Sequence, residues 1–204
     1  MPKRRTALAS VAAAALTATL PAAAQLAGIG RVRRAVGQLV AIRGQSLVRL
    51  GVGDEVFAED ILRTDAEGKA LIVCEGGLEI TLGPATELAL RRFAVDGSEH
   101  LTAFFGLLRG IARLLGRLVA GSAVEVDTRT AVASVRATEW IVESADKGTA
   151  VLALSGLVEV RALAGGAVEL GPGEGTDVAP GGAPRPPALW GEPRRRAAVA
   201  RTTF

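Results

Sequence analysis

The sequence predicts an all-β domain, and three observations support this prediction. Short runs that alternate apolar and polar residues, or that are rich in β-branched residues, recur along most of the chain. Each run ends near glycine, proline or aspartate, which are residues that form turns. Only one stretch has the spacing of a helix. The 204 residues are enough for one ordinary domain with flanking segments.

Eight runs are expected to form strands. Their close spacing, without helices between them, favours stacked short antiparallel strands, arranged as a β-solenoid or as a β-sandwich. In chain order the runs are AVGQLVAIRG, GKALIVCEGG, LEITLGP, TELALRRF, AVEVDTRT, TEWIVES, GTAVLALSG and LVEVRAL.

The stretch FFGLLRGIARLLGRLVAG, residues 104–121, is the segment whose spacing also fits a helix. Its apolar side chains recur every three or four residues, and three arginines four residues apart would share another face. Gly106, Gly110 and Gly116 oppose a helix, because each glycine in a helix interior costs about 1 kcal/mol relative to alanine. We therefore expect strands and turns over residues 104–119.

A faint internal repeat relates two parts of the chain. Residues 68–80 (GKALIVCEGGLEI) and 148–160 (GTAVLALSGLVEV) align without gaps, and each is followed further on by LGP. Two copies of a strand-turn-strand unit would suggest stacked β layers, as in a short solenoid or a sandwich of related halves. The same pattern also arises by chance in proteins that are rich in β-hairpins.

The first 24 residues have the organisation of an export signal. Three cations precede an Ala/Leu/Val stretch, and Ala22-Ala23-Ala24 provides the small-x-small site that a signal peptidase accepts. We expect Gln25 to start the mature chain and residues 25–34 to form a basic lead. A retained membrane anchor is the alternative, which Pro21 and the threonines of the stretch disfavour. No later stretch is long and apolar enough to span a membrane.

Residues 180–204 form a C-terminal tail that is rich in proline, glycine and arginine. This composition favours an extended or disordered segment without a core of its own. Trp190 is the exception, since a large aromatic side chain in such a tail often docks onto a domain or a partner. The tail is therefore expected to add little to the stability of the domain between residues 35 and 179.

Charge is unevenly distributed along the chain. The formal net charge is +3, and the signal accounts for it, because residues 25–204 contain 21 basic and 21 acidic residues. The domain itself, residues 35–179, contains 13 basic and 20 acidic residues. An acidic domain gives little support to nucleic-acid binding.

Few residues are suited to catalysis. Cys74 is the only cysteine and lies in the apolar run ALIVC, so we expect a buried, unreactive thiol. His100 is the only histidine and lies in the turn-like DGSEH, where a solvent-exposed loop residue is expected. A Cys-His pair and a transition-metal site are therefore not expected, while counting alone leaves a Ser-His-acid arrangement open.

The acid-rich GDEVFAED, residues 53–60, is a weak candidate for calcium. It lacks the alternating oxygen ligands and the central glycine of an EF-hand loop, so we expect two solvated turns. The two LGP turns lack the second glycine and the Lys-Ser/Thr pair of a phosphate loop. The sequence therefore predicts no catalytic residue, no cofactor and no metal site.

Four pieces of the chain follow one another between about Ala35 and Val178. They are VGQLVAIRG with LGVGDEVFAEDILRTDAEGKALI, GLEITLGPATELAL, LLRGIARLLG with VEVDTRTAVASVRATEW, and GTAVLALSGLVEV with LGPGEG. Their order resembles the FecR domain, the periplasmic domain named for the iron-dicitrate regulator. The third piece is the most specific, because it is similar to the family's run from G-x-x-R through T-x-x-A to V-R-G-T-x-F. Ala137 replaces the usual glycine of that run.

The resemblance singles out Arg136, Thr138, Glu139 and Trp140 in SVRATEW, which would join two strands, the second starting at Trp140. In a structural role, Arg136 would bond turn carbonyls or Glu139, Thr138 would bond local backbone, and Trp140 would cap the core. In the alternative role these residues would form a docking surface for a partner.

The resemblance implies a non-catalytic sensing, signalling or scaffold module, periplasmic or secreted, that acts through protein-protein contacts. Its partner would be another periplasmic or envelope protein, bound by pairing a strand with an open sheet edge. A sigma regulator of this family also has a cytoplasmic helical domain and a transmembrane helix, so this chain would need a separate partner to signal across the inner membrane.

A cell-wall or glycan-binding exported domain is the alternative function. It has less support, because the chain has no tyrosine, five phenylalanines and two tryptophans with which to build aromatic platforms.

Overall fold

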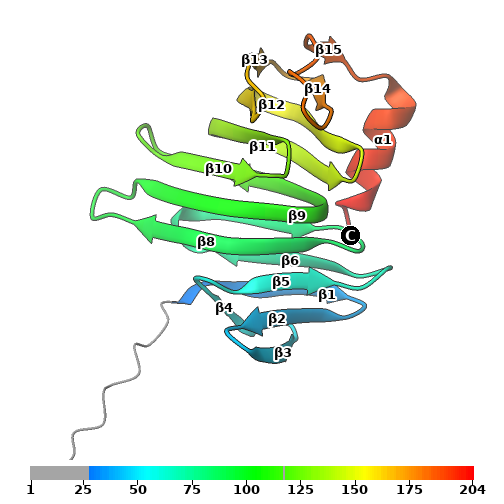
Figure 1. Ribbon diagram of the computed structural model, residues 1–204. Coiled ribbons are helices and arrows are strands. Elements are labelled where there is room, and N and C mark those ends of the chain that lie inside the picture. Colours follow the sequence, from blue (N-terminus) through cyan, green and yellow to red (C-terminus); the bar gives the residue numbers. More distant parts are fainter. Residues whose placement is uncertain (1–27, 117) are drawn as a thin grey trace, which may run out of the picture.

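The described chain consists of strands and short helical elements, so the predicted all-β class is confirmed (Figure 1). The computed structural model describes residues 28–116 and 118–204, and at residues 136–138 it describes the backbone alone. The predicted signal, residues 1–24, lies outside the described residues. The elements are β1 (Gly28–Val36), β2 (Leu39–Arg43), β3 (Ser46–Leu50), β4 (Glu55–Phe57), β5 (Ile61–Thr64), β6 (Lys69–Cys74), the 3-10 turn η1 (Glu75–Gly77), β7 (Leu78–Leu82), β8 (Glu87–Val95), β9 (Leu101–Gly116), β10 (Ala123–Asp127), β11 (Ala131–Ala145), β12 (Gly148–Ala162), β13 (Ala167–Leu170), β14 (Glu174–Val178), β15 (Ala188–Leu189) and α1 (Glu192–Arg201).

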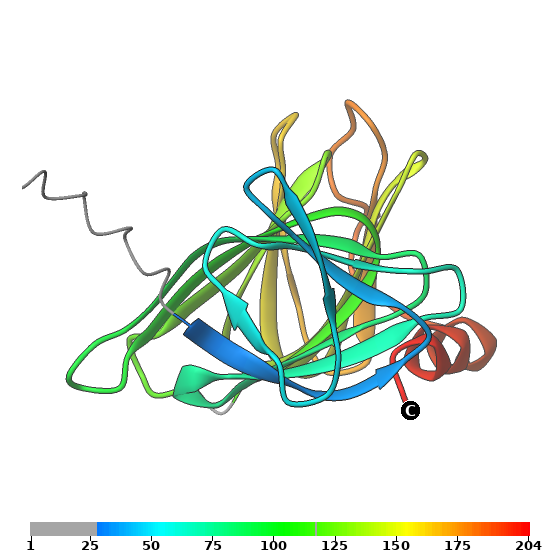
Figure 2. The same cartoon turned by 90° about the horizontal axis from the view of Figure 1, so that it is seen from below.

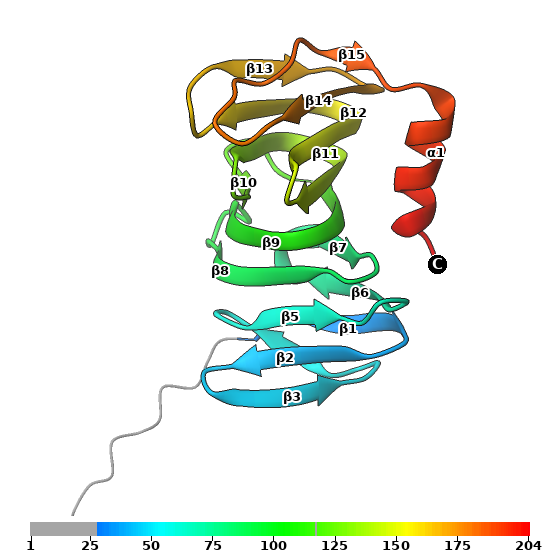
Figure 3. The same ribbon diagram turned by 45° about the vertical axis from the view of Figure 1, so that its right-hand side comes forward.

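The strands belong to one continuous sheet that folds back on itself into two layers. Layer one contains β3, β2, β5, β8, β10 and β13, and layer two contains β4, β1, β6, β7, β14 and β15. The long strands β9, β11 and β12 run through both layers: the first half of β9 pairs with β8 and β10, and its second half pairs with β7 and β11. The strands stack in tiers from β3 to β13 and β15 (Figure 3) and wrap around one axis (Figure 2).

This architecture is barrel-like, so the predicted solenoid is wrong, and the layers are not the two separate sheets of a sandwich either. Three strands are shared between the layers, because each bends where it passes from one layer to the other. Gly110 in β9 and Gly156 in β12 have φ of 91° and 71°, a backbone conformation that glycine adopts without strain. Alternating strand patterns are the same in all three architectures, which is why the sequence did not distinguish them.

One hydrophobic core fills the space between the layers. Phe105 and Trp140 are the largest fully buried side chains in it, and aliphatic side chains of both layers surround them. In β6 and β7 every second residue is buried, as expected of strands with one face in a core.

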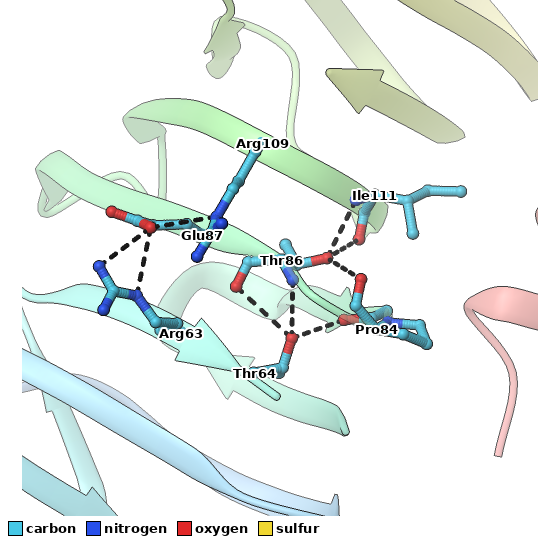
Figure 4. A network of polar contacts seen from close by, with 8 residues as sticks. Arg63, Thr64, Pro84, Thr86, Glu87, Arg109 and Ile111 are labelled. Atoms are coloured by element: carbon cyan, nitrogen blue, oxygen red, sulfur yellow. Dashed lines mark hydrogen bonds and ion pairs between the residues drawn. The ribbon is translucent and has the colours of Figure 1, made fainter. Parts of the chain in front are cut away.

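Buried threonines hold together the corner at which the chain passes between the layers (Figure 4). The Thr64 hydroxyl donates to the Gly83 carbonyl at 2.7 Å and accepts from the Thr86 amide at 3.0 Å. The Thr86 hydroxyl in turn donates to the Ile111 carbonyl at 3.1 Å and accepts from the Ile111 amide at 3.0 Å. These bonds satisfy backbone groups that the bends remove from the ladder, so they join three successive tiers.

The prediction of β structure for residues 104–119 is confirmed as far as Gly116, where β9 ends. The glycines do not mark turns between strands, which corrects that part of the prediction. Gly110 bends β9 where a side chain would collide with Thr86, and Gly106 lies under the side chain of Arg91. Glycine here allows close contacts within one long strand.

The two copies of the internal repeat fold differently. The first forms β6, η1 and β7, as predicted, whereas the second forms β12 without a break. Gly76 and Gly77 have φ of 65° and 75°, while Leu157 takes the place of the second glycine in the later copy. Because leucine is strained in that conformation, the second copy bends at Gly156 and does not form a turn.

The C-terminal tail is folded, which corrects the prediction of an extended or disordered segment. It adds β15 to β14, packs Trp190 against Gly175 and ends in α1. Arginine and alanine dominate α1 and are both good helix formers, so the proline and glycine content of the whole tail misled the prediction. None of the helices in residues 28–116 and 118–204 is long and apolar enough to cross a membrane.

The basic lead also contributes to the sheet. Arg31, Arg33 and Arg34 lie in β1, which pairs with β4 and β6. The sheet therefore includes residues ahead of the composition boundary at residue 35.

Candidate functional site

The segment SVRATEW lies inside β11, which corrects the prediction that it joins two strands. The register of β11 shifts between Arg136 and Glu139, and again between Glu139 and Trp140. Up to Val135 β11 pairs with β10, and from Glu139 onward it pairs with β9. The motif is thus the bend at which one strand crosses from layer one to layer two, and Ala137 occupies it.

The two motif residues with described side chains point in opposite directions. Trp140 is 1% exposed and belongs to the core. Glu139 lies on the outer face of layer two and accepts a hydrogen bond from Arg113 Nε at 2.7 Å and a second one from Nη2 of the same guanidinium. The side chains of Arg136 and Thr138 lie outside the described atoms. Because Trp140 is inside, Glu139 and Trp140 do not form one docking surface.

Glu139 lines one end of a groove across the outer face of layer two. This end has a volume of about 240 Å³ and the adjoining part about 710 Å³. Arg34, Leu71 and Glu79 line both parts, so the groove crosses β1, β6 and β7. Its outward residues follow the alternation of strands β6 and β7, but the sequence does not show that β1 lies beside them.

Charges of both signs border this groove, and several are paired. Arg31 forms an ion pair with Glu55, and the Arg34 guanidinium lies 4.6 Å from the ring centroid of Phe204. Leu71 and Val73 provide apolar floor between them. Because these charges are of both signs and several are paired, the lining does not favour a single anion or a metal ion.

His100 closes the loop between β8 and β9. Its Nδ1 lies 3.0 Å from Asp96 Oδ2, and the amides of His100 and Ser98 donate to Asp96 Oδ1 at 2.9 and 2.8 Å. The His100 amide bond, then the His100 side-chain bond and the Ser98 bond, lower the pKa of Asp96. In the described chain no hydrogen bond joins a serine hydroxyl to His100, so this pair acts as a loop clamp.

Cys74 is buried, as predicted. Burial, with a smaller contribution from Glu75, raises the pKa of its thiol to about 12. The thiol therefore stays protonated near neutral pH, which makes it a poor nucleophile.

The carboxylates of GDEVFAED have separate partners. Asp54 accepts the Gly51 amide at 2.7 Å, as expected of a turn. Asp60 is fully buried, so the prediction of a solvated turn is wrong for it: it accepts Arg43 Nε and Nη2, both at 2.8 Å, and the Phe57 amide at 3.0 Å. The bond to Asp60 raises the pKa of Arg43. Within residues 28–116 and 118–204 no cluster of three or more His, Cys, Asp or Glu could hold a metal ion.

Strand β3 is an open edge of the sheet. It pairs with β2 alone, through a two-residue turn in which Gly44 has φ of 59°. Ser46 closes this turn opposite Arg43, so the amides of Leu47 and Arg49 point away from β2. Leu47 is 65% exposed. With five residues, β3 is longer than the edge strands β4, β13 and β15.

Sequence reasoning expected an open edge without saying which strand provides it. The pairing of β3 depends on tertiary contacts between β2 and β5, which the sequence does not encode locally. One signal in the sequence could have indicated this edge: two hydrophobic residues, Leu47 and Val52, lie close to glycine turns, and both are largely exposed.

Comparisons with known proteins agree with the fold. Residues 60–159 match the family model described as FecR protein. This range starts just before β5 and ends within β12. The resembling pieces before residue 60 and after residue 159 lie outside that match. No curated protein gives a significant match.

Two crystal structures of a candidate anti-sigma factor from Parabacteroides distasonis have similar folds, with TM-scores of 0.57 and 0.55 and sequence identities of 18% and 19%. Each alignment covers 68% of this chain, which spans 63% and 64% of the length of those chains. At these identities the similarity concerns the fold, while the family follows from the sequence match. The chain therefore carries a FecR domain.

Proposed function

We propose that the protein is a non-catalytic regulatory module that acts in the periplasm or outside the cell by binding another protein. The FecR match over residues 60–159 is the observation that carries this proposal. The described polar residues support it, because His100, Cys74 and Asp60 each serve a loop or the core and none is arranged for catalysis.

The partner binds by adding an extended segment to β3. The outward amides and carbonyls of Leu47 and Arg49 offer a ladder to such a segment, and strand addition of this kind uses main-chain hydrogen bonds for affinity. Exposed Leu47 would then pack against a side chain of the partner.

Proline at Arg49 tests this contact. It removes the outward amide while leaving the bonds between β2 and β3 intact, since proline is tolerated on edge strands. The parent protein and Arg49→Pro are each crosslinked in an envelope fraction, and the captured proteins are quantified by mass spectrometry. Arg49→Pro is expected to capture much less of the partner than the parent protein does.

Leu163→Asp is the matched control, because Leu163 is 64% exposed in the turn between β12 and β13 at the opposite end of the stack. It should capture the same partner as the parent protein. Equal capture by all three proteins would rule out the β3 edge as the contact.

Export is the second part of the proposal, and the motifs of residues 1–24 support it. The mature protein should begin at Gln25 and be released with the periplasmic or secreted fraction. N-terminal sequencing decides this, and an intact Met1 on protein extracted with the membrane would refute it.

The glycan-binding alternative gains no support from the tryptophans. Trp140 is buried, and the Arg194 guanidinium lies 3.6 Å from the centroid of the Trp190 ring. Neither ring offers an open platform on which a sugar could stack.

A further inference from the structure

We propose that the outer face of layer two beneath α1 is a docking surface for a basic amphipathic helix, and that α1 is its displaceable internal occupant. This surface is separate from the β3 edge and does not depend on the function proposed for that edge. Figure 3 shows α1 standing beside the tiers of β9, β11 and β12, outside the sheet.

The sheet presents an apolar patch to α1. Ile111, Ile141 and Leu152 point outward from β9, β11 and β12, and together with Ala198 they form a hydrophobic cluster separate from the main core. Outward-facing side chains of a sheet normally meet water and are polar, so three large aliphatic residues there indicate a surface built to be covered.

The helix covers this patch, so that Ile111, Ile141 and Leu152 are no more than 1% exposed, but it does so with small side chains. Ala198 is the one buried residue among the ten residues of α1, and Val199 is the largest apolar side chain that the helix offers. The N-cap residue Gly191 makes no side-chain capping bond. A helix of this length is unstable alone, so α1 persists because of its contacts with the sheet.

Exposed polar bonds also hold α1 and the residues after it to the sheet. Arg201 pairs with Glu143 at 2.7 Å, Arg194 donates to Asp177 at 2.9 Å, and Lys69 Nζ donates to the carbonyls of Ala200 and Thr203 at 2.8 and 2.6 Å. The side chains of Arg201 and Arg194 are 41% and 46% exposed, so water and salt weaken both ion pairs.

The same features define the partner. Glu143 and Asp177 flank the apolar patch, so they select a helix with basic residues at its two ends. A partner helix with leucine or isoleucine where α1 has Ala198 and Val199 would bury more apolar area and would replace α1.

Charge reversal at Arg201 tests this proposal in the full chain. Arg201→Glu places a carboxylate beside Glu143 and should raise amide exchange in α1 about tenfold, while β9 and β11 stay protected. A fluorescein-labelled peptide of residues 186–204 that carries Ala198→Leu should then bind Arg201→Glu and not the parent protein, as measured by anisotropy. Lys69→Ala removes the two bonds that β6 donates to the end of α1, so it should also raise amide exchange in α1 and allow the peptide to bind.

Two controls complete the test. Arg196 lies in the same helix, is 76% exposed and pairs only with Glu192 in the described chain. Arg196→Glu should therefore leave α1 in place on the sheet. The double variant Glu143→Arg/Arg201→Glu should restore closure and abolish peptide binding. Unchanged exchange in both releasing variants, or an open helix whose exposed face binds no peptide, would overturn the proposal.

Discussion

Replacing Trp140 with alanine is expected to destabilise the protein by about 3–5 kcal/mol. Trp140 is fully buried between the layers, immediately after the bend of β11, and belongs to the main core. The surroundings can relax only partly into the cavity left by an indole at this position, because both layers are fixed by their ladders. Thermal melts should show a decrease in Tm of about 10 °C or more.

Trp190→Ala is the matched comparison. Trp190 is only partly buried and packs against Gly175 and Arg194, so its loss should cost clearly less than the loss of Trp140. If Trp140→Ala melted like the parent protein but failed to capture the partner, the motif would be a docking surface and not a part of the core.

Arg43→Ala should be similarly destabilising, by about 3–5 kcal/mol, because it leaves a buried carboxylate without its counter-charge. Asp60 is fully buried, and two bonds from Arg43 and one from the Phe57 amide satisfy it. The Arg43 guanidinium also lies 4.2 Å from the centroid of the Phe57 ring. Chemical denaturation at neutral pH measures this loss.

The pair Arg129 and Asp146 provides the control. It has a similar distance, 2.8 Å, but the Asp146 side chain is fully exposed. Arg129→Ala should therefore leave the free energy of unfolding nearly unchanged. Equal effects of the two arginine variants would mean that burial of Asp60 does not govern its contribution.

Local patterns in the sequence predicted the strands but not the way they are joined. Alternation in residues 69–82 and the glycines of residues 104–116 correctly predicted strands at both places. Whether a glycine reverses the chain or bends it depends on its neighbours: Gly76 is followed by a second glycine, and Gly156 by leucine. The choice between barrel-like and solenoid architectures follows from such bends, which only the tertiary pairing defines.

The sequence of β11 and β12 indicates that a further segment covers the outer face of these strands, although the composition of the tail did not suggest a helix there. EWIVES and TAVLALS contain consecutive apolar residues, and such runs are typical of strands that are covered on both faces. Trp140 and Ile141 point to the core and to α1 respectively. The sequence thus indicates that something covers Ile141, but the covering segment lies about 50 residues away in the chain and is itself polar.

Which side chains of SVRATEW face outward could not be predicted from the sequence. Glu139 does lie on the outer surface, where it lines the groove with Arg113, but Trp140, its neighbour, does not. One residue of offset along a strand reverses the direction of a side chain, and the register shifts of β11 decide which residues face outward. The sequence analysis expected an open sheet edge that pairs with a partner, but it did not identify β3 as that edge.

The claim that a partner adds a strand to β3 is tested most directly by amide exchange of the exported protein, measured alone and with its captured partner. The account predicts that the outward amides of Leu47 and Arg49 exchange about tenfold or more slowly in the complex, because they become ladder donors. Protection that appears only elsewhere, for example along the groove of β1, β6 and β7, or no protection at all, would contradict it.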